Sequence, residues 1–145
     1  MPITVEICQQ VTDEVAAAFE RLVPQLSSSA RVPSRSELNE IAANESLLIA
    51  RDSDQDNLIV GSLTLVTFRI PTGVRAWIED VVVDEAARGK GAGEALTRRA
   101  LERAAELGSK TVDLTSRPTR EAANRLYQRV GFELRHSNLY RYNLK

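Results

Sequence analysis

The stretch that decides the fold is VVVDEAARGKGAGE, residues 81–94. It begins with three β-branched residues, which favour a strand, and it leads into a segment with the apolar spacing of an amphipathic helix. Between them, Gly89, Gly91 and Gly93 stand at alternate positions, so the backbone N–H groups of the turn are not covered by side chains. Such groups at a helix N-terminus attract anions, and Arg88 and Lys90 add positive charge there. The stretch therefore predicts a strand, a tight loop and a helix that together hold a pyrophosphate.

Three kinds of phosphate loop compete for this pattern. A P-loop requires GxxxxGK[ST], a string that the sequence does not contain. A dinucleotide-binding fingerprint requires GxGxxG, but counting from Gly89 the third glycine position holds Glu94. The remaining pattern is [R/Q]xxGxG, which Arg88, Gly91 and Gly93 satisfy. A flexible turn with incidental basic residues is the simplest alternative, and the position between a strand and an amphipathic helix argues against it.

Outward from this stretch, strands and helices alternate along the chain. Apolar alternation and β-branched runs predict strands over residues 3–9, 47–51, 57–70 and 76–83, a short strand over 111–115, and one or two closing strands within 132–144. Helical spacing and capping residues predict a helix after Thr12, a second after Ser34, a third over 91–107 and a last over 120–130. This order predicts a mixed α/β fold, with parallel pairing across the later strand–helix–strand crossover.

Composition narrows the class of protein. The 145 residues are 43% apolar and 27% charged, which suits one globular domain over residues 1–145. The net charge of −1 argues against a nucleic-acid-binding module. No apolar run is long enough to span a bilayer, and residues 1–6 do not have the pattern of a signal peptide. Because Cys8 is the single cysteine, no intramolecular disulfide can form. We therefore expect a cytoplasmic protein with neither membrane nor nucleic acid as a partner.

The glycine stretch resembles the acyl-CoA signature of the GNAT superfamily of N-acetyltransferases. The family's second recognisable region is a short strand, a helix with an LY pair, and then GF; here these are residues 112–114, Leu126-Tyr127 and Gly131-Phe132. Both regions occur in the family's order and at about its spacing. The resemblance implies one N-acetyltransferase domain with a central, mostly antiparallel sheet flanked by helices. It also implies that the sheet is splayed between the strands that contain residues 81–83 and 111–115, and that acetyl-CoA is the co-substrate.

The resemblance also implies where acetyl-CoA binds. The backbone of the strand residues Val81, Val82 and Val83 would pair with the pantetheine arm. The pyrophosphate would sit on the loop, formed by Arg88, Gly89, Lys90, Gly91, Ala92 and Gly93. Many family members have an asparagine where Arg120 stands, and we expect Asn124, one turn further on, to contact CoA instead.

Three side chains are candidates for the acyl-transfer chemistry. Tyr127 resembles the tyrosine that many family members use to protonate the CoA sulfur, although its place on an apolar helix face also suits simple packing. Glu79 and Asp80 precede the pantetheine strand, and regular strand geometry would send them to opposite faces. Glu79 is the preferred acid, because the string IEDxxV resembles that of glucosamine-phosphate acetyltransferases. Solvated charges, or ion pairs with Arg75, are the alternative.

The sequence thus predicts an acetyl-CoA-dependent N-acetyltransferase whose acceptor amine attacks the thioester directly, with a backbone N–H near Val81 or Val82 facing the developing oxyanion. His136 is the single histidine, so no histidine-based metal cluster is expected. The acceptor is left open among small-molecule amines, amino sugars, polyamines, antibiotics, and protein N-terminal or lysine amines. The alternative from another class is a CoA-binding sensor or regulatory domain that does no chemistry. Dimerisation is common among similar proteins, and the sequence identifies no interface.

Overall fold

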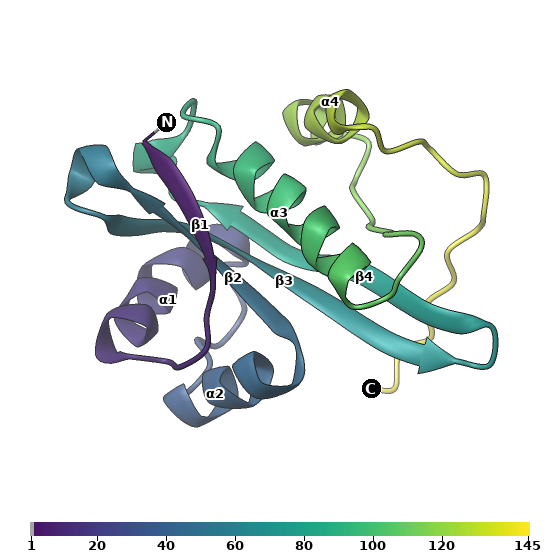
Figure 1. Ribbon diagram of the computed structural model, residues 1–145, viewed down its shortest axis with the longest axis horizontal. Helices are drawn as coiled ribbons and strands as arrows, with labels where there is room; N and C mark the ends of the chain where they lie inside the picture. The colour runs from purple at the N-terminus through teal and green to yellow at the C-terminus, as the bar shows by residue number, and fades with distance from the viewer. Residues whose placement is uncertain (1) are drawn as a thin grey trace. The chain divides into compact units, whose positions relative to one another are not determined.

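The computed structural model describes residues 2–145. Its elements, in chain order, are β1 (Ile3–Ile7), α1 (Asp13–Leu26), α2 (Arg35–Asn44), β2 (Ser46–Asp52), η1 (Ser53–Gln55), β3 (Leu58–Ile70), β4 (Gly73–Val83), η2 (Glu85–Ala87), α3 (Ala92–Glu106) and α4 (Glu121–Val130) (Figure 1). The chain divides into two compact units, Met1–Thr115 and Ser116–Lys145. The first unit contains all the strands named above, and α4 belongs to the second. None of the helices within residues 2–145 has both the length and the apolar character needed to cross a membrane.

One antiparallel sheet organises the first unit, with the strand order β1-β2-β3-β4. The helices α1 and α2 pack on one face through a buried cluster that includes Leu22, Leu38 and Ile49. The next residue of β2, Ala50, faces the other way and lies with Gly61 against Leu96 of α3. Successive side chains of a strand point to opposite faces, so the sheet is covered on both sides, as Figure 1 shows. The predicted mixed α/β class with a mostly antiparallel sheet is confirmed.

Local capping signals placed the first two helices correctly. The Thr12 hydroxyl accepts a hydrogen bond from the Val15 backbone N–H at 3.2 Å, which satisfies one of the unpaired donors of α1. Ser34 and Glu37 form a reciprocal capping box at the start of α2. At the far end of α3, Gly108 adopts φ 91°, the left-handed conformation expected just beyond a helix. The helices predicted after Thr12, after Ser34 and over 91–107 are therefore confirmed, and the last predicted helix begins at Glu121.

The prediction of closing strands within residues 132–144 is wrong. Residues 132–145 contain no strand, and from residue 134 onward the large apolar side chains are exposed: Leu134, Leu139, Tyr140, Tyr142 and Leu144. A β-favouring composition is not enough, because a strand exists only through hydrogen bonds to a neighbouring strand. Within its own unit, the segment has the helix α4 beside it in the sequence and no strand edge on which to pair.

Candidate functional site

The loop between β4 and α3 presents open backbone donors. Gly89 and Gly91 have φ values of 85° and 83°, in the left-handed region that a side chain would strain. A Cβ at either position would meet no atom of the described chain within 4 Å, so the loop is open beside both glycines. Gly91 is the N-cap of α3 and, unlike Thr12 and Ser34, has no side chain to accept from the first N–H groups of its helix. The start of α3 can therefore offer donors to an external anion.

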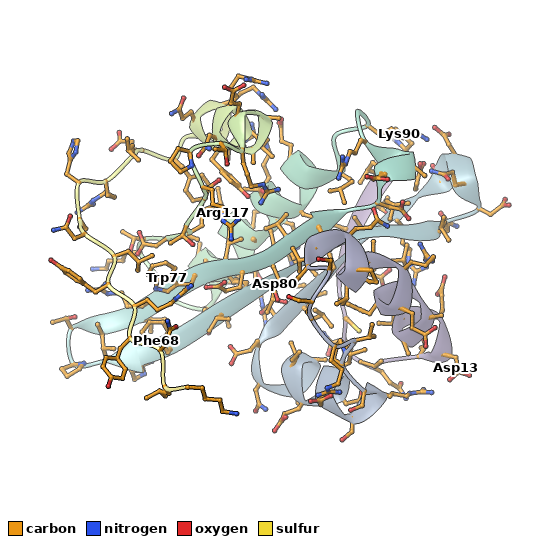
Figure 2. The ribbon with its side chains drawn as sticks, turned by 180° about the vertical axis from the view of Figure 1, so that it is seen from behind. Asp13, Phe68, Trp77, Asp80, Lys90 and Arg117 are labelled. Atoms are coloured by element: carbon orange, nitrogen blue, oxygen red, sulfur yellow. The ribbon has the colours of Figure 1, made fainter. Side chains whose placement is uncertain are left out.

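Lys90 is held by a buried carboxylate rather than standing free in this loop. Its Nζ lies 2.7 Å from Oδ2 of Asp52, whose side chain is 0% exposed. Figure 2 labels Lys90 in this loop. The hydrogen bond from Lys90 keeps the pKa of Asp52 below its ordinary value, and the same bond raises the pKa of Lys90. Asp52 thus neutralises one of the two charges that the sequence predicted for the loop, and Arg88 supplies the exposed one.

The segment that leads into the loop is tied to α1. Asp84 accepts a hydrogen bond from the Ala86 backbone N–H at 3.1 Å and pairs with the guanidinium of Arg21 at 3.1 Å. The side-chain oxygen of Gln25, one turn further along α1, accepts from the Glu85 backbone N–H at 2.9 Å. Both contacts come from residues about sixty positions earlier, and no local pattern in the sequence pointed to them.

A β-bulge interrupts β4 just before the predicted pantetheine strand. Val82 pairs with Ser62 and Glu79 pairs with Thr64, so two residues of β4, Asp80 and Val81, stand opposite one residue of β3. Asp80 has φ 49°, a left-handed conformation that aspartate tolerates better than most residues. The regular alternation that would send Glu79 and Asp80 to opposite faces is broken here, and both side chains are exposed. Sequence reasoning missed this bulge.

Glu79 lies on the sheet face that α1 and α2 cover. Its partner Thr64 and the partner of Val82, Ser62, are two residues apart on β3 and so share a face. Val82 packs in the buried cluster with α1 and α2, which places Glu79 on that same face. Within residues 2–145, neither Glu79 nor Asp80 forms an ion pair with Arg75, so that alternative is not what the structure shows.

The edge of β4 that faces away from β3 is open beside the loop. Among the described residues of the first unit, β4 pairs on this side through one parallel bridge between Trp77 and Asp113. In it the Ile78 N–H donates to the Asp113 oxygen at 2.9 Å, and the Asp113 N–H donates to the Ala76 oxygen at 3.0 Å. The strand predicted over 111–115 is thus reduced to a single bridge, and within the described part of the first unit no strand pairs with the outer edge of residues 81–83. The Asp84 N–H donates to the Val60 oxygen of β3. In an antiparallel pair, every second residue turns its backbone N–H and C=O toward the neighbouring strand, so those of Val83 point away from β3. The sheet is therefore open at this edge beside the loop, and an extended ligand could add to it.

In the second unit, Tyr127 is the buried residue of α4. Its ring packs edge to face against Phe132, with the ring centroids 5.7 Å apart. Burial raises the pKa of the Tyr127 phenol, so its hydroxyl keeps its proton at neutral pH. Asn124 donates from its side-chain amide to the backbone oxygens of Arg117, at 2.9 Å, and Arg120, at 2.8 Å. Asn124 therefore stabilises the start of α4, a local role that sequence reasoning did not predict.

The described residues contain no group of three or more histidine, cysteine, aspartate or glutamate side chains that could hold a metal ion. In the first unit, Cys8 is buried, and burial raises the pKa of its thiol. Thiolate is the reactive form of cysteine, so Cys8 is not suited to act as a nucleophile.

Comparisons with known proteins agree with this geometry. A sequence model of the acetyltransferase (GNAT) family matches residues 9–132. Glucosamine 6-phosphate N-acetyltransferase 1 of Oryza sativa subsp. japonica is 33% identical over 113 residues, which cover 72% of this chain and 68% of that protein. A transcriptional regulator from Bacillus halodurans C-125 is 28% identical, with a TM-score of 0.77 over 97% of this chain and 99% of the other. Glucosamine-6-phosphate N-acetyltransferase from Arabidopsis thaliana, 17% identical, shares the fold with a TM-score of 0.79 over 98% of this chain and 99% of the other. The chain belongs to the acetyltransferase (GNAT) family and is an N-acetyltransferase.

Proposed function

We propose that this protein transfers the acetyl group of acetyl-CoA to a primary amine. The observation that carries the proposal is the open start of α3, with Gly91 at its N-cap, which follows a strand whose outer edge is unpaired beyond the Trp77–Asp113 bridge within the described part of the first unit. In CoA the pantetheine arm is joined to the pyrophosphate. The outer edge of β4, where the arm would bind, leads in the same way into the glycine loop, where the pyrophosphate would bind. The family match over residues 9–132 spans both compact units, which supports their working as one N-acetyltransferase domain.

The residues of the first unit fit acetyl-CoA. Left-handed glycines leave the loop open, so the backbone of residues 89–93 can approach a pyrophosphate, and Arg88 adds an exposed positive charge. The outward backbone groups of Val83 would bind the amide groups of the pantetheine arm as an added strand, with Val81, which has no partner on β3, beside them. Val82 pairs with Ser62 of β3, so it would line the arm without bonding to it through its backbone. For Asn124 the proposed contact with CoA would use its side-chain oxygen, since its amide nitrogen donates to the backbone oxygens of Arg117 and Arg120.

Acetyl-CoA supplies the thioester carbonyl that the amine attacks. Side chains of this protein would take the proton of the acceptor ammonium and donate a proton to the departing CoA sulfur. Glu79, exposed next to the bulge, would hold the ammonium of the acceptor and take its proton, with Asp80 in a lesser role. A backbone N–H near Val81 or Val82 would face the developing oxyanion, because the bulge frees backbone groups from the ladder. Tyr127, protonated at neutral pH, would donate to the CoA sulfur.

The acceptor class tested first should be amino sugar phosphates. The relative from Oryza sativa subsp. japonica is named for glucosamine 6-phosphate, and residues 78–83 carry the IEDxxV string that resembles such enzymes. The family match and this relative support an amine acceptor in general. Polyamines, aminoglycosides and peptides with a free N-terminus are the other acceptors to be assayed.

The experiment is to measure release of free thiol from acetyl-CoA with each amine. We expect acceptor-dependent thiol release and an N-acetylated product by mass spectrometry. Binding of CoA without turnover of any amine would favour the non-catalytic sensor. A protein that shows no binding of CoA by calorimetry would overturn the proposal altogether.

A further inference from the structure

The turn between β2 and β3 reaches the glycine loop through one buried ion pair. Asp52 is the last residue of β2, and its carboxylate accepts from Lys90 Nζ at 2.7 Å, Gln55 Nε2 at 2.7 Å and the Asp54 backbone N–H at 2.9 Å. Lys90 stands between the two left-handed glycines, Gly89 and Gly91. The pair therefore joins the middle of the loop to a residue 38 positions earlier.

Burial decides what Lys90 can do when a pyrophosphate arrives. The Asp52 side chain is 0% exposed, whereas that of Lys90 is 33% exposed. If the ammonium left to bind phosphate, Asp52 would remain buried with a negative charge and with only neutral donors, Gln55 and the Asp54 N–H. An uncompensated buried charge is strongly destabilising, so the pair should persist when the ligand binds.

We propose that Asp52 is a positioning residue for acetyl-CoA. Through Lys90 it holds the loop so that the backbone N–H groups at Gly89 and Gly91 face the pyrophosphate. Lys90 itself acts as a tether rather than as a phosphate ligand. This inference rests on the proposed acetyl-CoA site, and it adds a residue outside the family's glycine signature, on a different strand.

The direction in which Asp52→Asn changes the affinity for CoA distinguishes a tether from a direct phosphate ligand. If Lys90 is a tether, Asp52→Asn releases the loop and weakens CoA binding by about tenfold or more, the scale of losing one charge-assisted hydrogen bond. If Lys90 binds the pyrophosphate directly, Asp52→Asn frees its charge, and CoA should bind equally well or more tightly. Lys90→Met weakens binding on either account, so Asp52 is the informative position.

The control is Asp56→Asn in the same turn. Asp56 is exposed and has φ 55°, a left-handed conformation that asparagine also tolerates, and it makes the same change of charge without touching Lys90. The double variant Asp52→Asn/Lys90→Met tests coupling: if the two residues act as one unit, it should bind CoA no more weakly than the worse of the single variants.

The measurement is the dissociation constant of CoA by calorimetry, with the melting temperature of each variant recorded without ligand. Amide hydrogen exchange of residues 85–91 without ligand should rise in Asp52→Asn and not in Asp56→Asn. With an accepted amine, Asp52→Asn should raise KM for acetyl-CoA and leave kcat at saturation within about twofold, a split that general loss of structure would not give.

Unchanged or tighter CoA binding by Asp52→Asn overturns the positioning role and leaves the acetyl-CoA site intact. So does an equal loss of affinity in Asp56→Asn. If the wild-type protein does not bind CoA, the proposed function itself fails. The tether is established if CoA binds more weakly to Asp52→Asn and Lys90→Met but not to Asp56→Asn, and if amide exchange in the loop is faster in Asp52→Asn.

Discussion

Two glycines bracket α3 with nearly the same backbone conformation. Gly91, the N-cap, has φ 83°, and Gly108, just beyond the last turn, has φ 91°. A Cβ at either position would meet no described atom within 4 Å, so Gly91→Ala and Gly108→Ala both add strain without a steric clash. They differ in one respect: Gly91 lies in the proposed pyrophosphate loop, and Gly108 lies at the opposite end of the same helix.

The expected loss of stability is similar for the two variants. A left-handed conformation costs an L-residue about 1–2 kcal/mol. For a chain of about 150 residues, each kcal/mol lowers the melting temperature by about 2–4 °C. Both variants should therefore unfold about 2–8 °C below the wild type. Only Gly91→Ala places a methyl group beside the N–H donors of the loop, and we expect it to weaken CoA binding at least about tenfold, or about 1.4 kcal/mol.

The assay is thermal unfolding with and without CoA, supported by calorimetry. At a CoA concentration of about 100 times the wild-type dissociation constant, binding stabilises the native state by about 2.7 kcal/mol. A site about ten times weaker gains only about 1.4 kcal/mol at the same concentration, so the CoA-induced shift should roughly halve in Gly91→Ala. Gly108→Ala should keep the full shift. Equal CoA-induced shifts in the two variants would refute the assignment of the loop as the pyrophosphate site.

Ionisable side chains carry the remaining predictions. Glu79→Gln should lower kcat while leaving CoA affinity nearly unchanged, and Asp80→Asn should do less; equal small effects in steady-state kinetics would indicate solvated charges. Tyr127→Phe keeps the ring packing and should lower kcat about 10²-fold with KM for acetyl-CoA barely altered. An unchanged kcat would remove Tyr127 from the mechanism, and a lower melting temperature alone would mark it as a packing residue. The hydrogen bonds from Arg31 and the helix cap lower the pKa of Glu37 from 4.5 to about 2. A depressed folded-state pKa stabilises the protein above about pH 4.5, and this stabilisation is lost as pH falls toward 2. Melting temperatures between pH 2 and 5 should show a shallower acid dependence for Glu37→Gln than for the wild type.

Local chemistry explains what could be predicted from the sequence alone. The caps at Thr12 and Ser34 depend on side chains that bond to a backbone only three residues away. The open loop depends on Gly89 and Gly91, which adopt left-handed conformations without the steric cost that a Cβ would add. The family patterns around residues 81–94 and 126–132 rest on short strings of the same kind, so the family and the mixed α/β class could be inferred without coordinates.

The features that the sequence did not reveal all join residues that are far apart along the chain. The bulge at Asp80 exists only through the register of β4 against β3, and the apolar and polar pattern of β4 in the sequence does not indicate it. The pair of Asp52 with Lys90 spans 38 positions, and Asp113, the bridged residue of the predicted strand over 111–115, pairs with the distant Trp77. The same reason accounts for the closing strands that did not form, since backbone pairing requires an edge that a segment's own composition cannot supply. The sequence by itself therefore determined the family and the loop that can hold a phosphate. Only the tertiary structure decided that Glu79 and Asp80 are exposed at the bulge and that Asp52 binds Lys90, because both depend on contacts between distant parts of the chain.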